Sequence, residues 1–376
     1  IKQVTTRGLV KNTLHFTVDK MTVNKDREGT IIIEGTDSFL RSTITVKQKK
    51  KDMSTLTLHV EKAGTLEELI GSENRYEVED LTLTGELNGD DVFFIRDMAG
   101  RTIVPASANN HTDGKLKVLD ISKATIREGG RNYWDDRSWS SRSCRTKDYT
   151  VSEYMFNDLE NIISIQIPNN TIAIEEKAFY NCKNITSFKL PNTIKTIGEK
   201  AFECAGLNSI TIPNSVMEIG EAAFSKNPLQ HLTIESGGTV SIGKFAFREC
   251  ESLISVTLGD GIVNIDEGAF QYTSFTSITI PSSVTNMGID VFEYSQLNSA
   301  IIEEGATTIY ANAFRNCESL ISVTIPNTVK IIENGAFAYS GLTSVTIPNS
   351  VTEIKMAAFR NLLLMLRDSC RLGSSS

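Results

Sequence analysis

Phenylalanine recurs at a fixed interval through the second half of this chain. Ten of these residues follow one another at spacings of 22 or 23 positions: Phe156, Phe179, Phe202, Phe224, Phe247, Phe270, Phe292, Phe314, Phe337 and Phe359. A period in the low twenties indicates one structural unit that is stacked on copies of itself. The sequence therefore predicts a repeat solenoid in which these ten side chains form the structural core of the stack.

Each unit contains a short stretch of alternating apolar and polar residues that ends in proline. In one copy Leu207, Ile210 and Ile212 alternate with polar residues, and Pro213 follows. This alternation is typical of a strand with one buried face, and proline ends it because proline has no N–H for the ladder. The period leaves no room for a full crossover helix, so we expect one solenoid coil per unit. Equivalent strands would lie about 4.8 Å apart in one parallel sheet.

The unit resembles the leucine-rich repeat family, and within it the BspA-like type of bacterial surface proteins. The residues that carry the resemblance in one copy are Leu207, Ser209, Ile212, Pro213, Ser215, Val216, Ile219, Gly220, Ala223 and Phe224. The match covers about residues 150–360 and stays in phase over nine periods. The resemblance implies a right-handed, curved solenoid of about nine to ten regular units. It also implies a role at the cell surface, in adhesion or host interaction.

The sequence divides into four segments by its patterning. We expect a small β-sandwich-like domain, irregular N-terminal leucine-rich units with a cap, regular repeats, and a C-terminal cap or tail, at residues 1–62, 63–150, 151–360 and 361–376. The first segment alternates like strands, with turn residues between them, at residues 14–18, 30–34, 42–48 and 56–60. Its stretch 29–48 weakly resembles the BACON-type β domains of gut bacteria.

The irregular units contain their own signals. Thr65 followed by Glu68 fits a capping box, which predicts a short helix over residues 66–70. The strand template recurs around Leu81, where we expect the solenoid to begin, and around Leu119. Leu119 and Ile165 are equivalent strand centres 46 residues apart, so one or two irregular units are expected between them.

The exposed face of the predicted strands is small, polar and almost without charge. One outward column is Ser164, Ser187, Ser209, His231, Ser255, Ser277, Ser299, Ser322 and Ser344. The other is Gln166, Lys189, Thr211, Thr233, Thr257, Thr279, Ile301, Thr324 and Thr346. A hydroxyl ladder that keeps the sheet solvated explains most of these positions. A contact surface for an extended protein or glycan is the alternative, and Lys189, His231 and Ile301 are its candidate residues.

The largest departure from the repeat is the segment 132–142, which holds both tryptophans of the chain. Its candidate binding residues are Tyr133, Trp134, Arg137, Trp139 and Arg142. Trp, Tyr and Arg are enriched in binding hot spots, and aromatic faces also suit sugar rings. The competing interpretation is that both tryptophans fold back and cap the apolar end of the regular stack.

Charge and composition exclude several classes of function. The formal charge is −8 overall, and residues 1–64 carry 12 Lys and Arg against 7 Asp and Glu, so the remainder carries −13. An acidic solenoid argues against nucleic-acid binding, which requires basic surface. No apolar stretch is long enough to cross a membrane. The chain begins at Ile1, and we expect that a leader has been removed.

No pattern of catalytic or metal-ligating residues stands out. The four histidines are scattered, there is no metal-ligand spacing, and neither a nucleophile elbow nor a phosphate-binding loop is present. Cys182, Cys204, Cys250 and Cys317 follow a repeat phenylalanine by two or three residues, which predicts buried thiols. A disulfide between Cys182 and Cys204 is the alternative. We expect no enzyme activity, no cofactor and no metal site.

These observations predict a secreted or cell-surface binding protein with a protein or glycan ligand, either free or lipid-anchored. Recognition of a host or matrix protein by the solenoid is implied by the family resemblance. One alternative is a glycan-binding module that uses the Trp134/Trp139 loop. Another is an architectural spacer that holds a further domain away from the cell.

Overall fold

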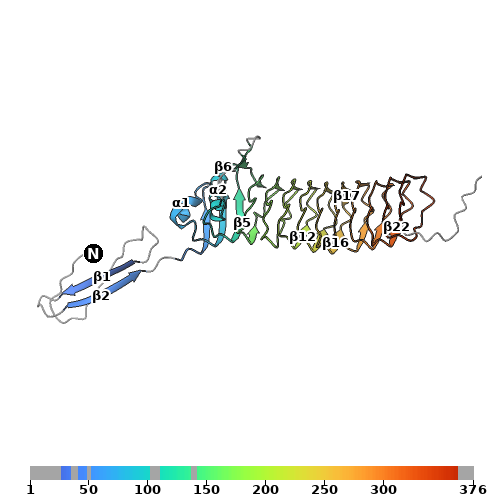
Figure 1. The fold of residues 1–376 in the computed structure, drawn as a ribbon. Helices are drawn as coiled ribbons and strands as arrows, with labels where there is room; N and C mark the ends of the chain where they lie inside the picture. The colour runs from blue at the N-terminus through green and yellow to red at the C-terminus, as the bar shows by residue number, and fades with distance from the viewer. Residues whose placement is uncertain (1–26, 35–40, 49–51, 102–110, 137–141, 363–376) are drawn as a thin grey trace, which may run out of the picture. The chain divides into compact units, whose positions relative to one another are not determined.

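This computed structural model describes residues 27–34, 41–48, 52–101, 111–136 and 142–362. Its contacts divide the chain into two units, residues 1–55 and 56–376. In the first unit β1 (Arg27–Glu34) and β2 (Arg41–Gln48) form an antiparallel hairpin (Figure 1). This confirms the strands predicted at 30–34 and 42–48, whereas residues 14–18 lie outside the described part. The sandwich and the BACON-like resemblance stay predictions.

The second unit begins with a four-stranded sheet. Its order is β3 (Thr55–Val60), β4 (Asp80–Leu87), β5 (Val118–Ile126) and β9 (Ser164–Gln166). We predicted that residues 56–60 belong to the small N-terminal domain, and this prediction is wrong. The predicted beginning of the solenoid near Leu81 agrees with the register, since Leu81 pairs in parallel with Leu119 and Leu119 with Ile165. Strand β3 is hydrogen-bonded to β4, and Val60 and Leu81 are both fully buried, so β3 contributes to the core of the second unit.

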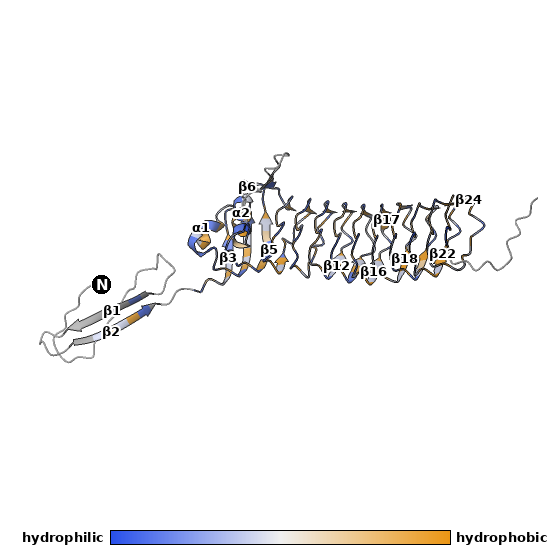
Figure 2. Cartoon of the chain, in the orientation of Figure 1, coloured by the Kyte–Doolittle hydropathy of each residue, from blue (hydrophilic) through white to orange (hydrophobic). Residues whose placement is uncertain are grey.

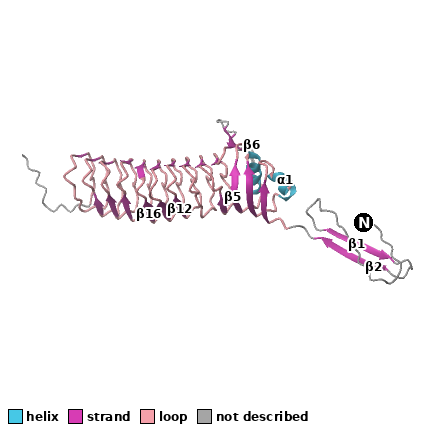
Figure 3. Ribbon diagram, turned by 180° about the vertical axis from the view of Figure 1, so that it is seen from behind, coloured by secondary structure: helices cyan, strands magenta, loops and turns pink. Residues whose placement is uncertain are grey.

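Two α-helices, α1 (Leu66–Ile70) and α2 (Gly89–Met98), lie at this end of the unit (Figure 3), with a 3₁₀ turn, η1 (Ser72–Asn74), between them in sequence. The helix predicted at 66–70 is confirmed, but its predicted cap is wrong. The Thr65 hydroxyl donates to the carbonyl of Lys62, 2.7 Å away, and makes no cap bond. Instead, the carboxylate of Asp91 accepts hydrogen bonds from the N–H groups of Gly64 and Leu66 at 2.6 and 2.9 Å.

From β9 onward the chain winds into regular coils, and the strands of successive coils pair in parallel. The first row of strands is β9, β12 (Ser209–Ile212), β14 (His231–Ile234), β16 (Ser255–Leu258), β18 (Ser277–Ile280), β20 (Ser299–Ile302) and β22 (Ser322–Thr324). Each pairing steps forward by one coil, as in Ser209 opposite His231 and His231 opposite Ser255. The predicted parallel-sheet solenoid is confirmed.

Each coil also contributes to a second row of short parallel strands, which the single predicted sheet did not include. The second row is β8 (Thr150–Val151), β10 (Ala173–Ile174), β11 (Thr196–Ile197), β13 (Glu218–Ile219), β15 (Val240–Ile242), β17 (Ile262–Ile265), β19 (Asn286–Met287), β21 (Thr308–Ile309), β23 (Ile331–Ile332) and β24 (Glu353–Ile354). The reason is that the apolar residue before each turn, such as Ile219, is itself in extended backbone and pairs with Ile197 of the preceding coil. Figure 2 shows hydrophobic and hydrophilic residues alternating along these walls.

The ten repeat phenylalanines stack along the interior. Adjacent rings have centroids 5.0–5.8 Å apart, from Phe156 to Phe359. All are buried except Phe359, which is half-buried in the last described coil. The backbone reinforces the stack, since the N–H of Phe202 donates to the carbonyl of Ala223 in the next coil at 2.7 Å.

Two residues around each phenylalanine adopt left-handed backbone. Lys200 and Cys204, placed two residues before and after Phe202, have φ of +54° and +56°. The same two positions have positive φ in the following coils. Such residues reverse the chain direction sharply. The coil can therefore turn twice around its phenylalanine and close within 22 or 23 residues.

Candidate functional site

The outer face of the first strand row is exposed and regular. In β12 and β18 the burial alternates strictly, with Ser and Thr outside and Ile inside. Lys189 and His231, which interrupt the hydroxyl columns, are both exposed. His231 lies between Ser209 and Ser255 in the sheet register.

Ile301 is the apolar exception on this face. It is 47% exposed in the middle of β20, whereas its neighbours Ala300 and Ile302 are buried. Its partners in the adjacent strands are Thr279 and Thr324. A threonine there would maintain the ladder, so Ile301 gives the face an apolar spot that core packing does not explain.

The predicted aromatic segment forms a hairpin that projects from the side of the coils (Figures 1 and 3). Its strands are β6 (Gly129–Asp136) and β7 (Arg142–Thr146), paired antiparallel. Strand β5 pairs directly with β9, with Leu119 opposite Ile165, so the hairpin is inserted within a single enlarged coil.

Tyr133 does not face solvent. Its side chain is fully buried, and its hydroxyl donates to the carbonyl of Glu153 at 2.8 Å. Burial raises the pKa of this phenol above its ordinary value. Tyr133 therefore anchors the base of the hairpin, and its ring is not available to a ligand as we predicted.

Trp134 is half-buried, and its ring stacks on Tyr154 with centroids 4.0 Å apart and planes 10° apart. The hydroxyl of Tyr154 donates to Glu176 at 3.0 Å and accepts a hydrogen bond from Lys177 at 3.0 Å. Burial opposes ionisation of Lys177, but its bonds to Tyr154 and Glu176 prevail and raise its pKa. One face of Trp134 is thus occupied by the first regular coil, as the capping interpretation requires.

The other predicted residues of the hairpin are placed only in part. Arg137 and Trp139 lie outside the described residues. Arg142 is opposite Asp136 in the backbone register of β6 and β7. The structure therefore places Tyr133 and Trp134 at the base of the hairpin. A binding role for Arg137, Trp139 and Arg142 stays a prediction.

Arg96 of α2 connects the irregular N-terminal end of the solenoid to the first regular coil. Its guanidinium is buried, and Nη1 donates to the carbonyls of Tyr154 and Met155, each 3.1 Å away. Burial lowers the pKa of Arg96 to about 10. Sequence analysis missed Arg96 and Tyr154, and for Tyr154 a signal was present. It occupies the position two residues before a repeat phenylalanine, where the regular coils carry no tyrosine.

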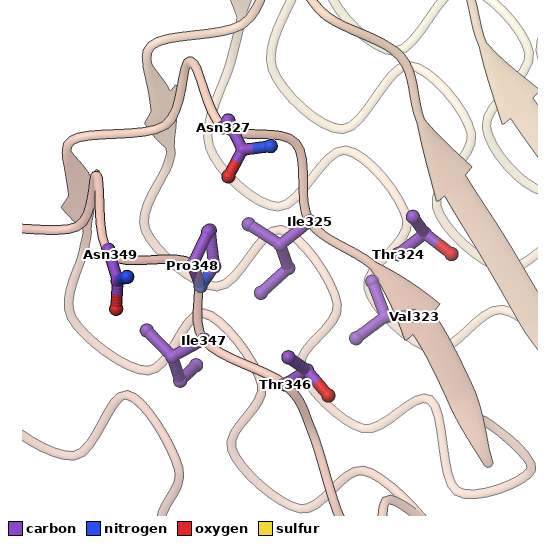
Figure 4. Close-up of a pocket in the computed structure, with 8 residues that line it drawn as sticks. All are labelled: Val323, Thr324, Ile325, Asn327, Thr346, Ile347, Pro348 and Asn349. Atoms are coloured by element: carbon purple, nitrogen blue, oxygen red, sulfur yellow. The ribbon is translucent and has the colours of Figure 1, made fainter.

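A groove of about 550 Å³ lies between the last two described coils of the first strand row (Figure 4). Its lining residues are Val323, Thr324, Ile325, Asn327, Thr346, Ile347, Pro348 and Asn349. The groove forms because β22 ends its sheet, so the following coil does not pair with it. Four of the lining side chains are apolar and four are polar, and none of them is titratable.

The four predicted cysteines are free thiols, so the alternative of a Cys182–Cys204 disulfide is wrong. Cys182, Cys250 and Cys317 are fully buried. Each places its Sγ against a phenylalanine carbonyl of the preceding coil, at 2.9, 3.2 and 3.1 Å. The cysteine at this position of the repeat therefore links its coil to the preceding one.

Within the described ranges, no three His, Cys, Asp or Glu side chains gather in a way that would hold a metal ion. Over the same ranges, none of the helices has the length and apolar character needed to cross a membrane.

The coil period, the buried phenylalanine row and the parallel strand rows define a stacked-repeat scaffold of the leucine-rich type. A family model, the BspA type leucine-rich repeat region, matches residues 134–240 and 240–365 in six copies. The chain belongs to this family. Leucine-rich repeat families are generally non-catalytic binding scaffolds.

Solved structures with a similar fold come from several bacteria. A leucine-rich repeat protein from Bacteroides ovatus is 20% identical, with 67% of this chain and 78% of that chain covered and a TM-score of 0.37. A leucine-rich cell surface protein from Faecalibacterium prausnitzii is 25% identical, with 53% and 70% covered and a TM-score of 0.32. The pneumococcal vaccine antigen PcpA is 15% identical, with 87% and 86% covered and a TM-score of 0.27. No curated protein sequence matches the chain.

Proposed function

We propose that this chain is a surface-displayed or secreted binding protein that recognises a host or matrix protein through the outer face of its first strand row. The observation that carries the proposal is Ile301, 47% exposed within a face of hydroxyl side chains. An exposed apolar residue at the centre of a polar face is typical of a contact anchor. Family membership supports the same class of function.

The arrangement of this face supports an extended protein ligand. Lys189, His231 and Ile301 lie on different coils of one wall, so a ligand that contacts all three must run along the solenoid. Ile321, 66% exposed immediately before β22, the strand next to β20, adds a second apolar contact near the same place. The surrounding Ser and Thr hydroxyls provide hydrogen bonds without fixed charge.

Surface capture with purified proteins tests the proposal. The whole chain would be immobilised and probed with a panel of host extracellular-matrix and serum proteins. Ile301→Glu should weaken the affinity for a captured protein about thirtyfold, because loss of a hot-spot contact commonly costs about 2 kcal/mol. The matched control is Ile172→Glu, a change at another exposed isoleucine, 46% exposed before β10 in the second strand row. Capture that survives Ile301→Glu, Lys189→Glu and His231→Glu together would contradict a role of this face, and no capture at all would favour the spacer.

A second candidate, glycan binding by the projecting hairpin, is favoured by one observation. Trp134 is half-buried and held rigidly on Tyr154, and a fixed aromatic ring is suited to stack on a sugar. A glycan array with the unmodified chain and with Trp134→Ala separates the two functions. Glycan signals that disappear in the variant would support the hairpin, whereas strand-face variants should leave them unchanged.

A further inference from the structure

We propose that a row of four side chains on the turn segments of three successive coils is a docking strip for a cationic segment of a partner protein. The strip consists of Phe245, Arg248, Tyr272 and Tyr294. These residues belong to the turns that follow the second strand row. The proposal is therefore independent of the first strand row and of the hairpin.

The four side chains form one continuous stack. The guanidinium carbon of Arg248 lies 5.3 Å from the ring centroid of Phe245 and 5.8 Å from that of Tyr272. Tyr272 in turn stacks on Tyr294, with centroids 4.9 Å apart and planes 4° apart. The row therefore contains a cation between two aromatic rings, extended by a third ring.

The residue types at these positions make the row unusual. Phe245, Tyr272 and Tyr294 have φ of +55°, +59° and +60°. Every regular coil has left-handed backbone at the positions two residues before and after its phenylalanine, but bulky residues rarely adopt it. Most other coils place small, amide or charged residues at the same positions, such as Ala222 and Asn181.

A neighbouring glycine accommodates the strip. A Cβ atom on Gly268 would lie 2.5 Å from Cδ1 and Cε1 of the Phe245 ring. The ring therefore occupies space that only glycine leaves free on the next coil. The position of the Phe245 ring in the row thus depends on Gly268 of the next coil.

The stack leaves one aromatic surface open. Tyr294 is 42% exposed, and the next coil has Asn316 at the equivalent position, so the row of rings ends there. Both faces of Tyr272 are covered, by Arg248 and by Tyr294. Sugar platforms need broad free ring faces, and this row presents mainly ring edges and a single face. The arrangement therefore favours a narrow cation over a sugar ring.

Charge points to the same occupant. Arg248 already shows that a guanidinium fits against these rings, and cations stack favourably on tyrosine faces. The carboxylates that border the strip are each paired with a cation, Glu249 with Arg248, Glu267 with Lys244 and Glu293 with Arg315, at 3.3, 3.1 and 3.5 Å. The attraction for a cation therefore comes from the wider surface. The sequence after residue 64 carries a formal charge of −13, which attracts cations and repels anions. An arginine-bearing protein segment has the required chemistry.

The test uses the whole chain and a fluorescent nona-arginine peptide, with binding followed by fluorescence anisotropy. Because any polycation is drawn to an acidic protein, the comparison is between variants of unchanged charge. Tyr294→Ala should weaken binding about fivefold, the scale of one exposed-to-desolvated cation–π contact, and Tyr272→Ala/Tyr294→Ala should weaken it further. The matched control is Tyr339→Ala, since Tyr339 has the same left-handed position outside the strip, with Arg360 5.9 Å from its ring centroid.

Further measurements distinguish the outcomes. Tyr294→Leu keeps an apolar side chain but removes the aromatic face, so it should lose binding like the alanine variant, and thermal melting should show all variants folded. Retained binding in Tyr294→Leu or in the double alanine variant would overturn the proposal. So would an equal loss in Tyr339→Ala, which would mean that binding is not specific to the strip. Binding of neutral cellohexaose that depends on Tyr294 would overturn it in favour of a glycan.

Discussion

The indole ring of Trp134 stacks on the phenol ring of Tyr154, with centroids 4.0 Å apart and planes 10° apart. Tyr154 belongs to the first regular coil and Trp134 to the inserted hairpin, so this contact joins the irregular end of the solenoid to its repeats. The role of Trp134 therefore depends on whether the contact serves stability, recognition or both.

Replacing Trp134 separates these roles. Trp134→Ala should destabilise the folded chain by about 1 kcal/mol or more, because stacked aromatic pairs contribute about 0.5–1.5 kcal/mol beyond their buried area. Trp134→Phe should retain most of the stability. Differential scanning calorimetry measures both, and the double variant Trp134→Ala/Trp139→Ala extends the test to the hairpin tip. A lost ligand with an unchanged melting temperature would support a binding site, whereas a lower melting temperature supports the cap.

The phenylalanine row should contribute most in the middle of the stack. Phe270 is fully buried between Phe247 and Phe292, with ring centroids 5.4 and 5.8 Å away. Phe270→Ala should cost about 3–5 kcal/mol because it leaves a cavity that neighbouring coils cannot fill. The control is Phe359→Ala at the last described coil, which should cost less, since Phe359 is half-buried. Equal losses in urea unfolding would contradict the nearest-neighbour stack.

The buried cysteines should be inert until the chain unfolds. Burial raises the pKa of Cys182, Cys250 and Cys317 to about 12. In the native chain at pH 8, iodoacetamide should therefore leave these three thiols unmodified, and peptide mass spectrometry reads the result. Cys204, which is half-buried, serves as the comparison.

The same pKa shifts predict a pH dependence of stability. The folded state holds the thiol protons more tightly than an unfolded chain with the ordinary thiol pKa of 9.0. The contribution of the thiols to stability is therefore complete below about pH 9 and is lost as the pH rises toward 12. Cys182→Val/Cys250→Val/Cys317→Val should weaken that decline. An unchanged alkaline slope in pH-dependent unfolding would contradict the prediction.

The N-terminal cap should depend on Asp91 and not on Thr65. The Asp91 carboxylate accepts hydrogen bonds from the N–H groups of Gly64, Leu66 and Asn88, at 2.6, 2.9 and 2.9 Å. Asp91→Ala leaves these donors without their acceptor and should cost about 2 kcal/mol or more. Thr65→Ala should change the melting temperature little. A larger loss of stability in Thr65→Ala than in Asp91→Ala would show that the cap predicted from the sequence is correct.

The coil was predictable because its signal is repeated. The alternation around Ile210, the proline at Pro213 and the period of Phe224 all recur in phase, so each copy reinforced the others. The second strand row was not predicted because strands such as Glu218–Ile219 are only two residues long. Two residues cannot show an alternating pattern, and their pairing depends on the neighbouring coil.

The irregular end was predicted less well because its residues occur once. The pair Asn88 and Asp91 begins helix α2, although its Asn-Gly-Asp-Asp sequence is also typical of a turn. Tyr133 and Trp134 are adjacent aromatic residues with the same propensities, yet one is buried and the other half-buried. Only the position of the hairpin against the first coil distinguishes them, and that position is a tertiary property.

The repeat phenylalanines from Phe156 to Phe337 bond through their backbone N–H groups to the next coil, as Phe224 does to Ala246 at 2.8 Å. Because these bonds join equivalent atoms in every coil, removing or duplicating one whole repeat restores the same bonds between the coils on either side. Copy number can therefore vary in the gene without a new fold having to arise. The length of the molecule would change in increments of about 4.8 Å, the separation of paired strands.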